Sequence, residues 1–425
     1  MKKILLSLLS TFYIITGFSQ ANVYPAPPQK GTIALTNARI HVGNGNIIEN
    51  GMVVFEKGKI TKVGMVEPAP GAEIIDCKGK EIYPGLINAN TNLGLNEIGA
   101  VRSTRDDYEL GELNPNVRAV VAYNTDSKII NTLKVNGILF ANVIPSGGLI
   151  TGSSSVMQLD AWNWEDAVYQ MDEGIHLRMP NFMRYSQNRD PLEDALKKLE
   201  TVKTFFNDAK AYLSSPSHVH TNLKFESVKG LFDGSQKLFI HADLERPMME
   251  GVELARQFGF KPVIIGGSDS WKITGYLKEN NVPVILSSSH SLPNFRDDDV
   301  DLPYKTPYLL QQAGLLYCIS DPDDQSRYRN LAFNAGTATG YGLTKEEALT
   351  AITLNAAKIL GIDSKTGSIE VGKDANIVVS DGDILDMRTN KVAYAFIQGR
   401  TLDLGNKQQQ LYDRYMHKYG LEEGK

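Results

Sequence analysis

The strongest constraint on the fold is an alternation of short apolar runs with amphipathic helical stretches through the middle of the chain. This order is typical of a parallel sheet whose strands are joined by crossover helices. Eight such strands would close a (β/α)8 TIM-like barrel, although the third run is weak and follows the second after a short connection. The eight runs lie near residues 81–88, 137–144, 154–159, 174–179, 237–242, 261–266, 282–287 and 315–320.

Helix signals fill several of the gaps between these runs. The clearest covers residues 344–360, where Thr344 has the N-cap position, Glu347 is its capping-box partner and Gly361 follows the last turn. Beyond residue 404 the tail also predicts a short surface helix.

The two ends of the chain share another pattern. Residues 31–83 contain short β-rich runs broken by glycines, and residues 367–400 alternate in the same way. We therefore expect both ends to form one small composite β-sandwich domain beside the barrel. The expected division is a signal peptide at 1–19, the N-terminal part of the β domain at 20–83, the barrel at 84–364, the C-terminal part of the β domain at 365–404 and a tail at 405–425.

Residues 1–19 have the pattern of a secretory signal peptide. Lys2 and Lys3 precede an apolar stretch at 4–15, and small residues lead to an expected cut at Gln20. We expect a periplasmic or secreted protein. The apolar stretch is shorter than the roughly 20 residues of a membrane-spanning helix, and no cysteine near the cut offers a lipid attachment point, so no membrane anchor is expected.

Net charge limits the classes of binding partner that we expect, and the cysteine content limits the disulfide bonds. Without residues 1–19 the chain has 42 basic and 49 acidic residues, a net charge of −7, which argues against a nucleic-acid partner. Its two cysteines, Cys77 and Cys318, each lie in an apolar run. They could pair in an oxidising compartment, but their surroundings favour two buried, unpaired thiols.

Residues 84–92 read Pro-Gly-Leu-Ile-Asn-Ala-Asn-Thr-Asn. This run resembles the Pro-Gly-(Leu/Phe/Ile)-(Ile/Val)-Asp-x-His-x-His motif on the first barrel strand of the amidohydrolase superfamily. Residues 347–357 and 367–379 resemble two further motifs of that family, in the same order. The resemblance covers residues 31–402. It implies a metal-dependent barrel hydrolase of non-peptide carbon–nitrogen bonds in a small molecule or modified peptide, with its site at the C-terminal ends of the strands.

The family's metal ligands are only partly kept. The resemblance places Asn88, Asn90 and Asn92 at the Asp and the two His positions of the first strand. It leaves His241 on the fifth strand and Asp321 after the eighth as the remaining candidate metal ligands.

Two other ligand positions are also changed. Residues 175–180 end the fourth strand without the lysine that is often carboxylated in the family, and glycines stand where the sixth strand would supply an imidazole. A carboxamide offers a transition metal only a neutral carbonyl oxygen, and replacing two ligands plausibly weakens binding on the order of 10,000-fold. We expect at most one weakly bound divalent metal such as zinc.

Each candidate site residue has a functional and a structural interpretation. Asp321 with His241 could be a catalytic pair, with Asp321 as general base toward water, or both could be hydrogen-bonded in a filled pocket. Asn88, Asn90 and Asn92 could bind a substrate or satisfy one another at the barrel mouth. Arg102, in a charged loop after the first strand, could select a charged substrate or lie in solvent.

Three hypotheses follow. The first is an exported amidohydrolase-type enzyme acting on a small-molecule substrate. The second is a non-catalytic binding or assembly relative, a pseudoenzyme, that forms a homo-oligomer or acts beside an intact paralogue. The third is metal-independent catalysis by Asp321 and His241.

Overall fold

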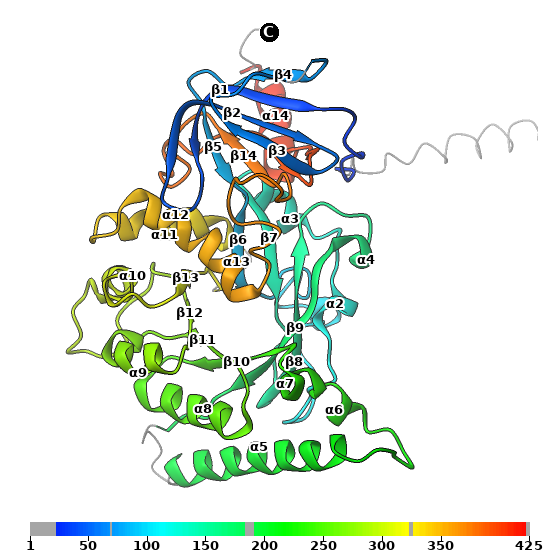
Figure 1. Cartoon of the computed structure of the whole chain (residues 1–425), viewed down its shortest axis with the longest axis vertical. Coiled ribbons are helices and arrows are strands. Elements are labelled where there is room, and N and C mark those ends of the chain that lie inside the picture. The colour runs from blue at the N-terminus through cyan, green and yellow to red at the C-terminus, as the bar shows by residue number, and fades with distance from the viewer. Residues whose placement is uncertain (1–22, 69, 183–190, 323–325, 422–425) are drawn as a thin grey trace, which may run out of the picture.

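The computed structural model describes residues 23–68, 70–182, 191–322 and 326–421. The expected signal peptide at residues 1–19 lies outside these ranges. Two eight-stranded sheets dominate the molecule, one above the other in Figure 1. Within the described ranges, no helix combines the length and apolarity needed to cross a membrane.

The smaller sheet joins the two ends of the chain. Its strand order is β16-β15-β14-β5-β1-β2-β3, with β4 paired to β1. Val378 lies opposite Tyr83 where β14 pairs with β5 in antiparallel fashion. The chain ends therefore share one sheet, while the sandwich arrangement stays a prediction. The strands are β1 (Ile33–His41), β2 (Ile47–Glu56), β3 (Lys59–Gly64), β4 (Glu73–Asp76), β5 (Glu81–Pro84), β14 (Ile377–Ser380), β15 (Val392–Ile397) and β16 (Arg400–Thr401).

The larger sheet is a nearly closed, TIM-like barrel of mixed α/β content. Its strands are paired in chain order from β6 to β13. They are β6 (Leu86–Thr91), β7 (Ile138–Val143), β8 (Ile150–Gln158), β9 (Val168–Arg178), β10 (Lys237–Ala242), β11 (Pro262–Gly266), β12 (Val284–Leu286) and β13 (Tyr317–Ile319). All eight predicted runs contribute to strands.

The expectation of eight parallel strands is wrong for β8, which runs antiparallel to both β7 and β9. The connections explain this. Residues 144–149 contain no helix, and residues 159–167 contain only the single turn α4 (Trp164–Ala167). A parallel crossover needs a dozen or more residues, so these short links allow only antiparallel neighbours.

The predicted run at 81–88 is divided between the sheets at Gly85. The amide N of Gly85 donates to the carbonyl of Asn376 in the small sheet's connection, and the amide N of Leu86 donates to the carbonyl of Gly137 beside β7. A Cβ on Gly85 would lie 2.7 Å from Cδ1 of Leu139. The chain thus passes from the small sheet into the barrel within one residue, at a point with no room for a side chain.

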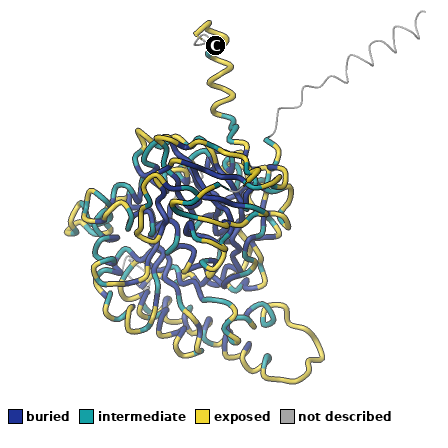
Figure 2. Tube along the Cα trace, turned by 45° about the horizontal axis from the view of Figure 1, so that its top comes forward, coloured by how far each residue is buried: buried dark blue, intermediate teal, exposed yellow. Residues whose placement is uncertain are grey.

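Helices cover the outside of the barrel and follow its last strand (Figure 1). They are α2 (Ala119–Ala122), α3 (Lys128–Lys134), α5 (Pro191–Leu213), α6 (Leu223–Glu226), α7 (Lys229–Asp233), α8 (Glu245–Phe258), α9 (Thr274–Glu279), α10 (Leu302–Ala313), α11 (Leu331–Thr339), α12 (Lys345–Ala351), α13 (Leu354–Leu360) and α14 (Lys407–Tyr419). The tail helix α14 projects from the end of the molecule and buries no residue (Figure 2).

The helix predicted at residues 344–360 is two helices, α12 and α13. The capping box of Thr344 and Glu347 is confirmed. The break comes at Ile352, whose carbonyl accepts a hydrogen bond from the amide N of Ile87 in β6. The Ile352 carbonyl would accept an i+4 hydrogen bond in an uninterrupted helix, but here it accepts one from the barrel strand β6 instead.

Both cysteines are buried and free, which confirms the prediction of unpaired thiols. Burial raises the pKa of Cys77 to about 11, and it also raises the pKa of Cys318. Both thiols are therefore protonated at neutral pH.

One side chain links the first and last strands of the barrel. Asn88 of β6 donates from Nδ2 to the carbonyl of Asp321, 3.0 Å away, and its Oδ1 accepts from the amide N of Asp321 at 3.2 Å. Both residues are fully buried. The carboxamide presents a donor and an acceptor as a peptide group does, and so it pairs β6 with the backbone that follows β13.

A second polar cluster ties the small sheet to the barrel helices. His41, at the end of β1, has Nδ1 2.6 Å from a carboxylate oxygen of Glu346 in α12 and Nε2 3.3 Å from Glu81 in β5. Its ring stacks on Tyr83 with centroids 4.5 Å apart. Burial opposes the charge, but hydrogen bonding to Glu346 and Glu81 outweighs it and raises the pKa of His41 to about 9.

Asn88→Ala should destabilise the protein by about 3 kcal/mol, because it removes both hydrogen bonds between this side chain and the buried backbone of Asp321. Asn90→Ala is the matched control on the same strand. The Asn90 side chain is part-exposed and makes no hydrogen bond to the described residues, so its loss should change stability by less than about 0.5 kcal/mol. Urea unfolding measures both. Equal losses would contradict closure by Asn88.

His41 predicts a specific pH dependence of stability. Its pKa in the folded protein, about 9, exceeds the ordinary value of 6.5, so its contribution is complete below pH 6.5 and is lost as pH rises toward 9. The loss should reach about 3 kcal/mol and should be absent in His41→Gln. The control variant His417→Gln, on the exposed helix α14, should show the same loss of stability with rising pH as the wild type. Urea unfolding gives the free energy of unfolding at each pH. If this free energy changes with pH equally in wild type and His41→Gln, the proposed charge on His41 is refuted.

Candidate functional site

A cavity of about 270 Å³ lies at the C-terminal ends of β10, β11 and β12. This is the end of a barrel at which active sites of this architecture are found. Loop residues that directly follow the three strands supply much of the lining, together with the loop before α10 and the first turn of that helix. The lining residues are Asp243, Gly266, Ser268, Asp269, Leu286, Ser287, Ser288, Ser289, Ser291, Leu292, Pro293, Asn294, Asp298, Leu302, Pro303 and Thr306.

Hydrogen bonds order the polar side of this cavity. Ser268 donates to a carboxylate oxygen of Asp243 at 3.1 Å and accepts from Nδ2 of Asn294 at 2.8 Å. Burial raises the pKa of Asp243. Asp269 is paired with Lys272, 2.9 Å away. Carboxylates and hydroxyls therefore dominate the lining, which suits a ligand rich in N–H groups or positive charge.

The predicted acid Asp321 is connected to this cavity. Its Oδ2 accepts from Nδ2 of Asn334 in α11 at 2.9 Å. The Oδ1 of Asn334 in turn accepts from the hydroxyl of Ser288, a lining residue, at 2.9 Å and from the amide N of His290 at 3.0 Å. Asp321 and Asn334 are fully buried, so two hydrogen bonds lead from the cavity wall to a buried carboxylate.

The predicted His241 belongs to a second chain of contacts inside the barrel. Nε2 of His241 lies 2.9 Å from Nδ1 of His176 in β9. Nε2 of His176 lies 2.6 Å from the hydroxyl of Ser154 in β8, which donates to Glu173 at 2.7 Å. Sequence reasoning missed the last three residues. His176 was visible at the end of the fourth run, but the pairing with Ser154 depends on the antiparallel β8.

Burial is the main influence on the pKa values of the ionisable groups in this series of contacts. It lowers the pKa of His176 and of His241, and the nearby Arg178 guanidinium lowers both further. Burial raises the pKa of Glu173 to about 7, against the opposing hydrogen bond from Ser154. Both imidazoles are therefore neutral, and Glu173 is the group in this chain that changes charge near neutral pH.

The other predicted residues lie in separate places. The Tyr328 hydroxyl donates to Oδ1 of Asn92 at 2.6 Å and accepts from its amide N at 3.2 Å. Asn90 is part-exposed, and Arg102 is exposed on a single 3-10 turn (Arg102–Thr104). Asn88 and Asn92 thus bond to other residues, and the alternative in which the three carboxamides satisfy one another does not hold for these two.

The donor set does not fit the metal centre that the resemblance implies. Across the described ranges, no three His, Cys, Asp or Glu side chains are grouped so that they could hold a metal ion. Nε2 of His241 and Oδ2 of Asp321 already make hydrogen bonds within the protein. A Cβ on Gly267 would lie 2.7 Å from Cγ1 of Val284, and the φ of +64° is unfavourable to any other residue. A missing sixth-strand ligand therefore cannot simply be restored there.

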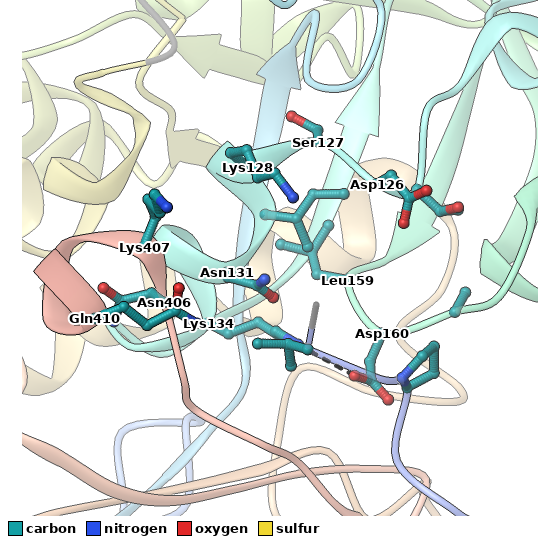
Figure 3. A pocket seen from close by; sticks show the side chains of 15 residues that line it. Asp126, Ser127, Lys128, Asn131, Lys134, Leu159, Asp160, Asn406, Lys407 and Gln410 are labelled. Carbon is teal, nitrogen blue, oxygen red and sulfur yellow. Dashed lines mark hydrogen bonds and ion pairs between the residues drawn. The ribbon is translucent and has the colours of Figure 1, made fainter. Parts of the chain in front are cut away.

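A smaller cavity, of about 60 Å³, lies between the start of the described chain, α3 and α14 (Figure 3). Its floor holds a buried ion pair between Lys134 and Asp160, 3.2 Å apart. Arg400 and the amide N of Ala26 also bond to Asp160, each at 2.9 Å. The contacts of Asp160 with Ala26 and Arg400 fasten segments near both ends of the described chain to the barrel.

Comparisons with known proteins agree with this architecture. The model of the amidohydrolase family matches residues 323–402. An imidazolonepropionase of Staphylococcus aureus is 25% identical over 357 residues, which are 79% of this chain and 84% of that protein.

Solved structures extend the likeness to the whole fold. A crystal structure of an amidohydrolase from Thermotoga maritima has a TM-score of 0.77 at 25% identity, and the match covers 87% of this chain and 99% of that one. A putative prolidase from Bifidobacterium longum shares the fold with a TM-score of 0.55 at 17% identity, covering 92% and 99%. The terminal motif, the relatives and the barrel together show that this chain belongs to the amidohydrolase superfamily.

Proposed function

We propose that this chain is an exported hydrolase that cleaves a non-peptide carbon–nitrogen bond in a small molecule or modified peptide, at a site whose metal centre is largely lost. The observation that carries the proposal is the cavity at the ends of β10 to β12, joined to the buried Asp321 through Ser288 and Asn334. Superfamily membership supplies the reaction class.

The proposed chemistry uses serines on the cavity wall and the buried Asp321 behind it. Asp321 acts as general base toward the attacking water, and the hydrogen bond from Asn334 holds its carboxylate in place. The serines at 287–289 offer hydroxyl donors and acceptors to the substrate. A volume of about 270 Å³ accommodates a small metabolite rather than an extended peptide.

The name of the relatives, imidazolonepropionase, directs the first choice of substrate to imidazolonepropionate. The acidic lining, with Asp243 and Asp298, further supports a substrate with N–H groups.

Location and partners are part of the proposal. The sequence of residues 1–19 supports export to the periplasm or the medium. The acidic net charge supports a small-molecule partner and no nucleic acid. A homo-oligomer, or an assembly with an intact paralogue, is the proposed quaternary state.

The second candidate is a non-catalytic binding or assembly protein. It is favoured by the hydrogen bonds that Asn92 and Nε2 of His241 make within the barrel, because the family resemblance implies metal ligands at these two positions. In that case the cavity binds a small molecule and Asp321 has only a structural role.

Purified protein should hydrolyse at least one member of a panel of amides, lactams, imides and imidazolonepropionate. Because the proposed base is a protein carboxylate, added zinc or manganese should change the rate less than about twofold. Product formation by mass spectrometry is the measurement. Failure on the whole panel, with and without metal, would favour the binding protein over the hydrolase.

Asp321→Asn should lower kcat on that substrate by about 100-fold or more and leave KM within a few-fold, since it removes the base but keeps the shape. Asp208→Asn, on the exposed face of α5, removes the same charge far from the cavity and should retain full activity. Steady-state kinetics of the two variants give the comparison. Undiminished turnover by Asp321→Asn would reject this role for Asp321.

A further inference from the structure

We propose that the guanidinium of Arg178 is an anion-binding group at the barrel mouth, and that the cavity at β10 to β12 takes a small molecule with a carboxylate group. Arg178 is the last residue of β9 and is exposed, whereas residues 173–177 before it are buried. Its guanidinium makes no hydrogen bond or ion pair with the residues that the structure describes. A permanent positive charge therefore stands at the mouth without a partner among them.

The position of Arg178 on its strand directs the side chain into the barrel. His176, two residues earlier on β9, contacts His241 inside the barrel, and alternate residues of a strand face the same side. Arg178 is also in register with His241 on the neighbouring strand β10. Its charge adds to the effect of burial and lowers the pKa of both rings further. Arg178 therefore extends over the inner face of the mouth and not toward the outer helices.

One carboxylate acts on Arg178 from the loop after β6. Partial burial lowers the pKa of Arg178, and the charge of Asp107 in that loop opposes this effect. Asp107 is bonded elsewhere, however. Its Oδ2 accepts from the hydroxyl of Ser146 at 3.0 Å, and its Oδ1 lies 3.8 Å from Nε of Arg105. Asp107 is thus already balanced by another cation, and the charge of Arg178 is available to a ligand.

The chemistry of the guanidinium selects the class of anion. Its planar N–H groups match the two oxygens of a carboxylate, or two oxygens of a phosphate, in a bidentate pair. A single unpaired cation balances one negative charge, and the nearby carboxylates of Asp107 and Asp243 repel a second. The mouth therefore favours a carboxylate monoanion over a phosphate dianion.

The acidic lining of the cavity determines the other end of the ligand. Asp243 of that lining is two residues beyond His241, the residue in register with Arg178. Strand spacing and rise put the Cα atoms of Arg178 and Asp243 about 8 Å apart. A ligand that reaches both has a carboxylate at one end and N–H groups or a positive charge at the other. Identifying this ligand as the substrate rests on the proposed function, but its binding does not depend on turnover.

The test is the affinity of the purified protein for matched acids and amides. The acids are imidazole-4-propionate and 4-guanidinobutyrate, which carry a carboxylate and an N–H-rich end, and their primary amides differ only in lacking the negative charge. Isothermal titration calorimetry should show at least one acid binding about 10-fold or more tightly than its amide, because the amide cannot form the charged bidentate pair. The same acid should also bind more tightly than inorganic phosphate.

Arg178→Gln should remove this preference, so that each acid binds no more tightly than its amide. Arg178→Lys should keep part of it, because it retains the charge but not the planar fork. Arg414→Gln is the matched control, since it removes the same charge from the exposed helix α14 and should keep the full preference. The midpoint of urea unfolding of Arg178→Gln should equal or exceed that of the wild type, whereas a structural role for Arg178 would lower it.

Equal affinity for acids and amides in the wild type, or no binding of either acid, would overturn the site. A preference that survives in Arg178→Gln would show that another group binds the anion, and tighter binding of phosphate would overturn the choice of a carboxylate. A protein that prefers the acids through Arg178 but hydrolyses nothing on the substrate panel would support the site and refute the proposed enzyme.

Discussion

One buried carboxamide links the first and last strands of the nearly closed barrel. Asn88 joins β6 to the backbone after β13 through two hydrogen bonds, and that backbone belongs to Asp321. These two hydrogen bonds therefore also fix the backbone position of Asp321, the acidic residue that follows β13. Because β5 and β6 meet at Gly85 without a linker, the small sheet is held to the barrel at the other end of the same strand.

This arrangement gives the barrel interior a different chemistry from the one that the family resemblance implies. The resemblance places Asn88, Asn90 and Asn92 at its motif's Asp and His positions, and in the structure Asn88 bonds to Asp321 and Asn92 to Tyr328. His241 bonds to His176 through Nε2. Neutral hydrogen-bonded groups pack in a dry interior at much lower cost than unpaired charges, which favours the pairing of Asn88, Asn92 and His241 with other protein groups.

Sequence reasoning predicted the barrel and the shared sheet because each leaves a local signal, an apolar run of strand length. The catalytic role of Asp321 came from a motif position and stays a prediction. Sequence reasoning failed where the outcome depends on contacts between distant segments. The antiparallel direction of β8 was signalled only by the short links around it. The break at Ile352 follows from its bond to Ile87, and the His176–Ser154–Glu173 chain requires β8 beside β9. No spacing in the sequence reveals such pairings.

We propose that hydrogen bonds within the protein, and not a metal, engage Asn92 and His241 at the barrel mouth. The most direct measurement is the zinc content of protein expressed with zinc supplementation and dialysed against about micromolar free zinc. The account predicts clearly substoichiometric zinc and unchanged histidine NMR signals. One or more zinc ions retained per chain, with His241 shifted by the metal, would contradict it.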